Sequence, residues 1–459
     1  MKILLISPAS GKWRRVGRRR LFNGRTFRFS MLPLLMVARL SPEDSDIRLI
    51  DEQVEDTPLD ETFDVVGITC MTATVPRAFE LCRHFRQRHI PVVLGGFFPT
   101  LNPQPALEHC DAVVIGPAIE AWPRLLEDLK AGRLQRQYRG NPNGKIPALL
   151  PRHLLNRQKY STVNSVYATM GCRNRCKFCS ISAVYHAHHY QRPVEEVIEE
   201  ISSFKTRFFM FVDDNLTQDR DYSMTLLRRL VPLRKKWVTQ ASIEIAEDPV
   251  LLALLKKAGC VGLFVGLESF NEKNLSQHEK EFSRPARYKK IADTFHRHGI
   301  FVQAGMIFGF EEDDVHVFES TLTMLEQVGI DVIQAAIMTP LPGTPLYEEM
   351  KPRILDTNWE HYDYRHAVFQ PRRMTAEQLQ AGADWVIRKY YSPWRILKRT
   401  LRWLTAPCGL SHFIYPFVLN WAYYGRMKTF GISGFNPAVR QDCVPAAYRL
   451  KTVSLIEQK

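Results

Sequence analysis

The chain has 459 residues, of which 45% are hydrophobic, and a formal net charge of +14. This length and apolar content are enough for two or three domains with sizeable cores. No run of about 18 uninterrupted apolar residues occurs, which excludes a simple membrane-spanning helix, and the apolar run at the N-terminus is too short for a signal peptide. Six of the nine cysteines lack the spacing of a disulfide framework, which predicts free thiols in a cytoplasmic protein: Cys70, Cys82, Cys110, Cys260, Cys408 and Cys443.

The first 150 residues alternate short apolar strands with helices. Strands are predicted at 2–7, 47–52, 64–70, 91–96 and 111–116, and helices at 74–88 and 119–130. This alternation favours an α/β fold with a doubly wound parallel sheet of the flavodoxin or Rossmann type. Such sheets bind ligands beyond the carboxyl ends of their strands. Small residues at these ends would let a large flat ligand approach the backbone: Thr72, Gly95, Gly96 and Gly116.

A glycine- and proline-containing linker at 140–147 leads to a second region with a longer strand–helix rhythm. Its strands are predicted at 165–170, 208–213, 237–243, 262–268, 301–309 and 331–338, with helices at 194–204, 248–258, 286–298 and 314–328. Six such units predict a partial (β/α)6 barrel. The remaining residues are aromatic and basic and predict a helical C-terminal region. The predicted domains are therefore 1–145, 160–350 and 351–459.

Three cysteines follow the first predicted barrel strand in a CxxxCxxC pattern. Cys172, Cys176 and Cys179 can hold three irons of a four-iron cluster, and the fourth iron is then open to a small molecule. The alternative is a zinc site, which needs a fourth cysteine or histidine at finger-like spacing. The nearest histidines stand seven to ten residues further on, in an irregular tract: His186, His188 and His189.

With this motif on a barrel strand, the chain resembles the radical S-adenosylmethionine (SAM) enzymes that carry a cobalamin-binding domain. The resemblance covers both halves, because Gly95-Gly96 and the strand ending at Gly116 are similar to the cobalamin-binding region of that family. Two positions depart from the family pattern: Phe98 stands where a histidine is common, and the usual Gly-Glu-Gly-Glu is Gly116-Pro-Ala-Ile-Glu120. The first domain also has no Asp-x-His-x-x-Gly motif, so no lower axial histidine to cobalt is expected.

The resemblance implies a set of cofactor-binding residues. Cys172, Cys176 and Cys179 would hold a 4Fe-4S cluster, and Phe178 would lie beside the adenine of SAM. Other strand ends are similar to SAM-binding elements of the family, and the small residues of the first domain would contact cobalamin. The residues implied for SAM are Asp213, Asp214, Glu268, Ser269, Gly305 and Gly309, and those implied for cobalamin are Thr72, Gly95, Gly96 and Gly116.

The C-terminal region resembles a bacterial subgroup that includes the hopanoid C-2 methylase and related lipid-biosynthesis proteins, for example at 359–363, 368–371 and 390–395. The implied activity is cleavage of SAM, hydrogen abstraction from an unactivated carbon and cobalamin-dependent C-methylation of a lipid or other hydrophobic metabolite. An external flavodoxin or ferredoxin would supply the electron. Cyclisation or carbon–carbon coupling of a tetrapyrrole or natural product uses the same modules and remains an alternative.

Other classes of function use different features of the chain. tRNA methylthiolation would exploit the positive charge and would need a second cluster on Cys70, Cys82 and Cys110. It is disfavoured, because no compact β-rich RNA-binding domain follows the barrel. A non-catalytic scaffold is disfavoured by the intact cysteine motif. Basic groups at 12–28 and 389–402, with an apolar run at 413–424, suit either a peripheral contact with the inner membrane or a solvated face over a buried helix.

Overall fold

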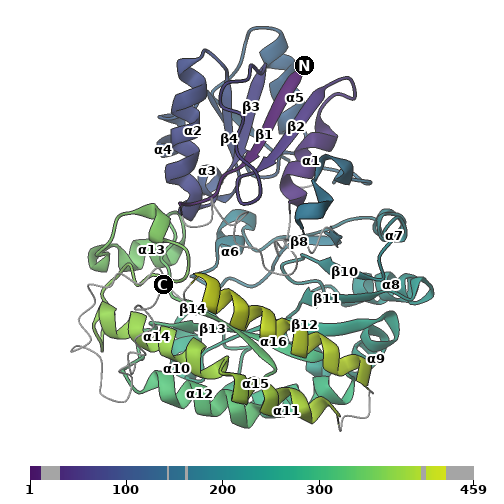
Figure 1. Ribbon diagram of the computed structural model, residues 1–459, viewed down its shortest axis with the longest axis vertical. Helices are drawn as coiled ribbons and strands as arrows, with labels where there is room; N and C mark the ends of the chain where they lie inside the picture. The colour runs from purple at the N-terminus through teal and green to yellow at the C-terminus, as the bar shows by residue number, and fades with distance from the viewer. Residues whose placement is uncertain (12–30, 142–143, 161–163, 405–409, 431–459) are drawn as a thin grey trace, which may run out of the picture.

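In the computed structural model, residues 1–11, 31–141, 144–160, 164–404 and 410–430 are described. They form two α/β domains, one above the other, and a helical C-terminal region on the side of the second domain (Figure 1). The basic group at 12–28 lies outside the described residues, as do Cys408 and Cys443.

The first domain is a six-stranded parallel sheet in the order β2-β1-β3-β4-β5-β6. Alternate residues of β1 enter different cores, because successive side chains of a strand point to opposite faces. Ile3 and Leu5 pack with the helices α1 and α5, whereas Leu4 and Ile6 pack on the side of α2, α3 and α4. Two covered faces explain why these strands read as continuous apolar runs. The bounds are β1 Lys2–Ser7, α1 Leu32–Leu40, β2 Asp46–Asp51, β3 Val65–Thr69, α2 Val75–Gln87, β4 Val92–Gly95, α3 Phe97–Leu101, α4 Pro103–Leu107, β5 Ala112–Ile115, α5 Ala121–Lys130 and β6 Gln137–Arg139.

The doubly wound sheet was predicted correctly, and each of the five predicted strands forms within two residues of its predicted ends. The elements that were not predicted are α1, β6 and the two five-residue helices α3 and α4. The helix α1 follows a basic tract that gives no periodic signal, and Pro33 in its first turn has the fixed φ that suits a helix start. The edge strand β6 has only three residues, which is too short for an alternating pattern to be recognised.

The second domain is a six-stranded parallel sheet in the order β14-β13-β12-β11-β10-β7. Its outer side is covered by helices, and alternate residues of β13, such as Val302, Ala304 and Met306, enter that core. Capping residues start these helices: Asp248 accepts from the Leu251 amide at the beginning of α9. The bounds are β7 Ser165–Val166, α7 Val194–Ser202, β10 Phe208–Phe211, α8 Arg220–Leu230, β11 Lys236–Gln240, α9 Pro249–Ala258, β12 Cys260–Glu268, α10 Glu272–Gln277, α11 Tyr288–Arg297, β13 Phe301–Phe308, α12 Val317–Val328 and β14 Val332–Ile337.

The strand predicted at 165–170 is divided. Its first part is β7 in the large sheet, and its second part, β8 (Thr169–Gly171), pairs antiparallel with β9 (His189–Gln191). The division occurs where the Asp213 carboxylate accepts hydrogen bonds from the backbone amides of Ala168 and Thr169. These bonds replace the ladder of the large sheet and carry the chain away from it.

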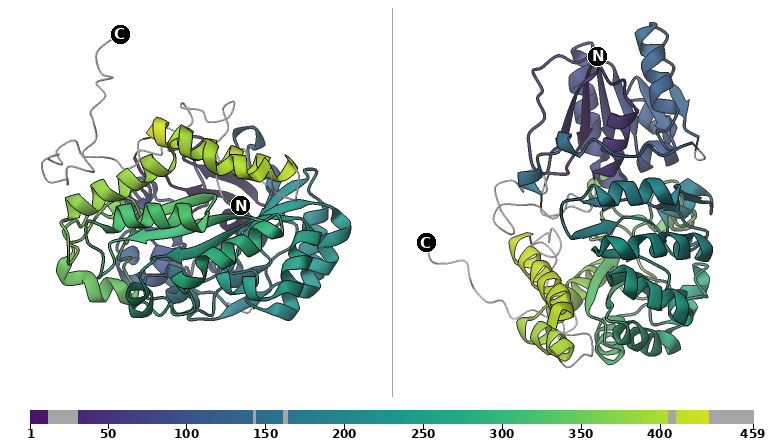
Figure 2. Two further views of the ribbon diagram at one scale, coloured as in Figure 1. Left: turned by 90° about the horizontal axis from the view of Figure 1, so that it is seen from below. Right: turned by 90° about the vertical axis from the view of Figure 1, so that its right-hand side faces the viewer.

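The C-terminal region consists of α13 (Pro345–Met350), α14 (Ala376–Tyr390), α15 (Pro393–Leu401) and α16 (Leu410–Phe430). The long helix α16 crosses the inner face of the second sheet (Figures 1 and 2). There Phe413, Tyr415 and Leu419 pack with Phe301 of β13. One side of the predicted apolar run is therefore buried, as expected for a helix over a core. In the part of the chain that is described, no helix is both long and apolar enough to span a bilayer.

Candidate active site

The carboxyl ends of the two sheets face one another. Helix α3, which follows β4, lies beside α6 (Ser180–Tyr185), which follows the cysteine motif (Figure 1). Asn102 Nδ2 donates to the Pro342 carbonyl oxygen across the two domains at 3.0 Å. Trp359, from the segment after the barrel, lies 4.8 Å from Phe98, centroid to centroid. The predicted ligand edges of both domains thus enclose one region.

The cysteine motif forms a short loop between β8 and α6. Gly171 has φ +83°, and a Cβ there would collide with the His188 carbonyl, so glycine is needed to begin the loop. The Cys179 amide donates to the Cys176 carbonyl oxygen at 3.0 Å, which brings these two residues onto one turn. Burial raises the pKa of all three thiols. For Cys176, burial and the nearby thiols Cys179 and Cys172 together raise the pKa to about 12, against a smaller lowering by Lys280. The three thiols therefore lie close enough to influence one another in a shielded loop.

The nearby histidines make other contacts. His186 is exposed, while ring nitrogens of His188 and His189 lie 3.1 and 3.3 Å from the carbonyl oxygens of Tyr185 and Asn215. Among the described residues, no group of three or more histidine, cysteine or acidic side chains is arranged to hold a metal ion. Support for a cluster thus comes from the loop geometry and from the comparisons below.

A buried ion pair lies beside the cysteine loop. Glu268 ends β12 with φ +63° and accepts from Lys280 Nζ at 2.9 Å, with both side chains almost fully buried. Burial lowers the pKa of Lys280, but the charges of Glu268 and Cys176 outweigh it and raise that pKa, so the ammonium stays charged. Glu268 was predicted to bind SAM, whereas Lys280 was missed. It lies in an irregular segment, where no periodic pattern marks a buried lysine.

Ser269 and Gly309, both predicted to bind SAM, are joined by one network. Asn274 Nδ2 donates to Asp313 Oδ1 at 2.8 Å and lies 3.4 Å from Ser269 Oγ. Asp313 Oδ2 accepts from the Gly309 amide at 2.9 Å. Burial raises the pKa of Asp313 to about 6. Asn274 and Asp313 were not predicted, because single polar residues outside a motif give no sequence signal.

Gly305 lies on the inner face of β13, beside Glu268. A Cβ at Gly305 would be 3.4 Å from Glu268 Oε2 and 3.1 Å from the Phe264 ring. Phe178 packs near this group, with His278 at 5.9 Å and Phe310 at 6.4 Å between ring centroids. Both ring nitrogens of His278 are buried without a hydrogen-bond partner in the described chain. Phe178 and Gly305 thus both lie near the Lys280–Glu268 pair, with Lys280 Nζ 5.9 Å from the Phe178 ring centroid, and their contact with adenine stays a prediction.

Asp213 and Asp214 hold the cysteine strand in place. Asp213 accepts from Thr169 Oγ1 at 2.6 Å, and Asp214 accepts from the Gly171 amide at 2.7 Å. Burial raises the pKa of Asp213 to about 7 and that of Asp214 to about 6. Their contact with the amino group of SAM stays a prediction. The observed contacts are with the backbone that leads into the cluster loop.

The first domain offers backbone and small residues at its ligand edge. Gly96 has φ +102° and lies against Cys70, where a Cβ would come within 2.8 Å of the carbonyl oxygen. Gly116, at φ +78°, borders open space, and its amide donates to Thr100 Oγ1 at 3.0 Å. Gly95 ends β4, and Thr72 is buried in the turn after β3. Open space beside glycine backbone fits a large flat cofactor.

The structure explains one of the two departures from the family pattern, the phenylalanine at position 98. Phe98, where the family commonly has a histidine, is buried and packs on Trp359 and Phe79. The site therefore gains an apolar contact between the domains at this position. The cysteines proposed for a second cluster, Cys70, Cys82 and Cys110, are buried in one core of the first sheet. Burial raises the pKa of each thiol above its usual value.

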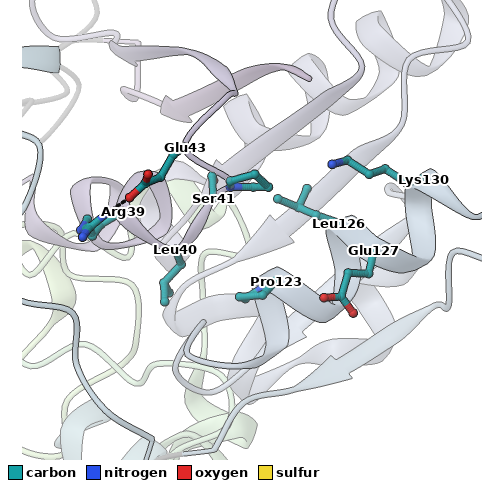
Figure 3. A pocket seen from close by; sticks show the side chains of 9 residues that line it. Arg39, Leu40, Ser41, Glu43, Pro123, Leu126, Glu127 and Lys130 are labelled. Atoms are coloured by element: carbon teal, nitrogen blue, oxygen red, sulfur yellow. Dashed lines mark ion pairs between the residues drawn. The ribbon is translucent and has the colours of Figure 1, made fainter.

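A surface hollow in the first domain is separate from this site (Figure 3). It includes the Arg39–Glu43 ion pair at 3.6 Å. Because α1 and α5 run antiparallel to the strands, their C-terminal ends lie at the amino edge of the sheet, away from its ligand edge. The hollow is lined by Arg39, Leu40, Ser41, Pro42, Glu43, Pro123, Leu126, Glu127 and Lys130.

Comparison with known proteins agrees with this geometry. Residues 33–126 match the B12 binding domain and residues 166–325 match the radical SAM superfamily. The chain is 30% identical over 382 residues to the bacteriochlorophyllide d C-12(1)-methyltransferase of Chlorobaculum tepidum, covering 80% of this chain and 84% of that protein. It is 25% identical to the hopanoid C-2 methylase of Rhodopseudomonas palustris, covering 69% and 63%.

The fold is also that of solved enzymes. The structure of OxsB with aqua-cobalamin and SAM bound matches with a TM-score of 0.64, covering 91% of this chain and 72% of that chain at 13% identity. TsrM from Kitasatospora setae, with cobalamin and a [4Fe-4S] cluster bound, matches with a TM-score of 0.60, covering 76% and 77% at 16% identity. The fold and site thus define a radical SAM enzyme with a B12-binding domain. The chain belongs to the cobalamin-dependent radical SAM methyltransferases.

The cofactors of this enzyme are a 4Fe-4S cluster, SAM and cobalamin. Three neighbouring thiols fit a cluster with one open iron, and the Lys280–Glu268 pair fits the charged end of SAM. The glycine-lined edge of the first sheet fits cobalamin. When bound, these groups supply radical and methyl-transfer chemistry, while the protein supplies orientation and a shielded site.

Proposed function

We propose that this enzyme methylates an unactivated carbon of a large hydrophobic ring compound that carries an anionic group. A tetrapyrrole of the chlorophyllide kind is the first candidate, because the bacteriochlorophyllide d methyltransferase matches most of the chain. The alternative is a polycyclic lipid without an anionic group, in view of the hopanoid methylase. An external one-electron donor of the flavodoxin or ferredoxin type is part of this proposal.

The space for the substrate is the inner face of the second sheet. Gln303 and Gly305 face inward on β13, while the alternate residues enter the outer core. Helix α16 covers this face, and its Tyr423 accepts from Gln303 Nε2 at 2.9 Å. Tyr423 also stacks on Tyr391, with ring centroids 5.3 Å apart. The inner face therefore combines aromatic surface with a few polar groups, as ligand sites for large apolar molecules do.

Two arginines approach this face and support an anionic substrate. Arg426 lies three residues after Tyr423 on α16, and Arg365 lies on the segment that follows β14. Burial and the charge of Arg365 lower the pKa of Arg426 to about 10, and burial lowers that of Arg365. Asp363 and Asp384 lie near Arg365 and partly offset the effect of burial on its pKa. The positive charge that the two guanidinium groups bring to this face supports a carboxylate or phosphate on the substrate.

The arginine side of this face is close to the cysteine loop. Tyr364, next to Arg365, contacts Ser180, and burial together with the nearby charge of Cys179 raises the Tyr364 pKa to about 12. The Tyr364 carbonyl oxygen also accepts from the Ile337 amide at 2.8 Å, at the end of β14. A substrate anchored by the arginines would thus extend toward the site where SAM and the cluster bind.

Binding of a chlorin with and without a free carboxylate tests the proposal. The full-length enzyme, purified anaerobically with cobalamin, is titrated with pyropheophorbide a and with its methyl ester, followed by chlorin fluorescence. We expect the acid to bind at least tenfold more tightly than the ester. The variant Arg365→Gln/Arg426→Gln should remove that preference, and Arg297→Gln, on the outer helix α11, should leave it intact. Equal binding of acid and ester would contradict an anionic substrate.

The reaction is tested with SAM that carries a deuterated methyl group. A methyltransferase transfers the label to the acceptor, and mass spectrometry of the product detects it. Diploptene, an uncharged polycyclic hydrocarbon, is the second acceptor and separates the lipid candidate from the tetrapyrrole candidate. The chain is also 24% identical over 240 residues to the anaerobic magnesium-protoporphyrin IX monomethyl ester cyclase of Cereibacter sphaeroides. Substrate consumption without label in the product would therefore favour cyclisation.

A further inference from the structure

Helices α15 and α16 expose an unusual number of large apolar side chains. Trp394, Leu397 and Leu401 are exposed on α15, and Trp394 is 73% exposed. Their spacing of three and four residues places them on one side of the helix. The opposite side, with Ile396 and Thr400, is buried. The solvent side of α15 is thus apolar where a surface helix normally carries polar residues.

Helix α16 repeats this pattern. Ile414, Val418 and Trp421 are exposed at spacings of four and three residues, while Leu419 and Tyr423 on the other side face the sheet. Trp421 lies among further aromatic rings of α16, such as that of Tyr424 at 5.3 Å. The six exposed side chains of the two helices are called the α15–α16 stripe: Trp394, Leu397, Leu401, Ile414, Val418 and Trp421.

The two helices are neighbours and lie on the side of the second sheet opposite to α11 and α12 (Figure 2). Elsewhere in the described chain, large exposed apolar residues stand apart in different elements, for example Val250 on α9 and Leu355 after α13. Scattered residues of that kind are normal on protein surfaces, whereas exposed apolar side chains that gather on two neighbouring helices favour a contact surface.

The sequence around the stripe is strongly basic. From residue 385 to residue 441 the chain contains no aspartate or glutamate. Lys398 is exposed on α15 beside Leu397, and Lys389 is exposed near the end of α14, while Arg399 and Arg402 point inward to Asn420 and Asp331. The surface thus offers apolar and cationic groups without any acidic residue of its own segment. The lysines and arginines of the segment are Arg388, Lys389, Arg395, Lys398, Arg399, Arg402, Arg426, Lys428 and Arg440.

We propose that the α15–α16 stripe binds the surface of an anionic lipid bilayer. An apolar stripe that contains tryptophan can enter the boundary between headgroups and acyl chains, and lysines beside it add attraction to anionic lipids. No helix of the described chain is fit to cross the bilayer, so the contact is with its surface. The contact does not depend on the identity of the substrate.

Vesicle flotation with the full-length protein tests this surface. The vesicles contain either phosphatidylcholine alone or a 70:30 mixture of phosphatidylcholine and phosphatidylglycerol, at low and high salt. We expect binding to the mixture at low salt and at least tenfold weaker binding to phosphatidylcholine. Trp394→Gln/Leu397→Gln should reduce binding about tenfold or more, because burial of the two side chains in the interface is lost. Lys389→Gln/Lys398→Gln should reduce it about fivefold per lysine, and this effect should vanish at high salt.

Matched controls change equally exposed residues elsewhere. Val250→Gln/Leu355→Gln and Lys256→Gln/Lys257→Gln should bind vesicles as the unchanged protein does, and circular dichroism checks that each variant is folded. Three outcomes would overturn the proposal. The first is equal vesicle binding by the stripe variants and the control variants. The second is a protein that forms a dimer and does not bind vesicles, with the dimer lost in the stripe variants. The third is vesicle binding that begins only after residues 431–459 are removed. The second outcome assigns the stripe to another copy of the chain, and the third assigns it to the C-terminal segment.

Discussion

The two parallel sheets meet at their carboxyl ends, but they bring different groups there. The first sheet offers glycine backbone and small side chains, such as Gly96 and Gly116, with space beside them. The second offers thiols and buried charged groups, such as Cys176, Lys280 and Asp213. A site for a large cofactor can be made by omitting side chains, whereas a site for a cluster and a charged sulfonium compound needs ionisable groups. Burying those groups costs free energy unless each has a partner.

The largest expected effect is at the cysteine loop. Cys176→Ala should lose nearly all of the roughly four irons expected for one cubane, and SAM cleavage should stop with it, because two thiolates do not hold the cluster. Iron analysis after anaerobic reconstitution measures this. Cys260→Ala is the control, since Cys260 is a buried thiol on β12 outside the site. Retention of full iron by Cys176→Ala would contradict the assignment of the cluster.

The next prediction compares how much a buried ion pair and a more exposed one contribute to the free energy of unfolding. Lys280→Met leaves the Glu268 carboxylate buried without its cation, and unfolding in urea should show a loss of about 3–5 kcal/mol. Lys280→Met/Glu268→Gln should recover most of that loss, yet neither variant should bind SAM in equilibrium dialysis. Lys177→Met removes the exposed pair with Glu349, 2.8 Å long, and should cost less than about 1 kcal/mol. Equal losses of unfolding free energy for Lys280→Met and Lys177→Met would contradict the stronger coupling expected for the buried pair.

The sequence predicted the parts of both domains that follow a regular pattern. Buried strands are continuous apolar runs, and the caps Asp248 and Gly259 mark the ends of α9, so strands and helices could be placed closely. The cysteine motif was recognisable because its spacing is fixed by the cluster. Lys280, Asn274 and Asp313 could not be found, because no motif marks them and long-range folding brings them to the site. Lys280 and Asp313 come from irregular segments, and Asn274 comes from the short helix α10.

The structural role of Asp213 is a further feature that the sequence could not predict. The sequence places it at the end of a barrel strand, where a contact with SAM was expected. Only the structure shows that its carboxylate accepts hydrogen bonds from the backbone amides of Ala168 and Thr169. The division of the predicted strand 165–170 follows from these bonds. A strand prediction considers local pattern alone, and therefore cannot foresee a carboxylate from another strand.

The buried carboxyl of Asp213 predicts a pH dependence. Burial raises its pKa to about 7 in the folded protein, compared with about 4 in an unfolded chain. The stabilisation from its protonated form is complete below pH 4 and is lost as pH rises toward 7. Asp213→Asn is neutral throughout, so the stability difference between wild type and variant should fall by up to about 4 kcal/mol across this range. Urea unfolding of both proteins between pH 4 and 7.5 measures it, and a constant difference would show that Asp213 does not titrate there.

The last predictions concern two glycines of the first sheet. Gly96 has no room for a side chain, whereas Gly116 borders open space that a ligand could fill. Gly96→Ala should cost about 3 kcal/mol in urea unfolding, because its Cβ would lie 2.8 Å from the Cys70 carbonyl oxygen at φ +102°. Gly116→Ala should cost only about 1 kcal/mol, since it bears the strain of positive φ without a collision.

The decisive variant of this pair is Gly116→Leu. Its side chain would enter the open space that we assign to cobalamin, so the cobalt content after purification with cobalamin should fall at least tenfold, with little further loss of stability. Gly132→Leu is the matched control, because Gly132 also has a positive φ (+69°) and open surroundings but lies in the turn after α5. If both leucine variants keep their cobalt, the space beside Gly116 is not the cofactor site. If only Gly116→Leu loses its cobalt, the first sheet binds cobalamin because Gly116 has no side chain.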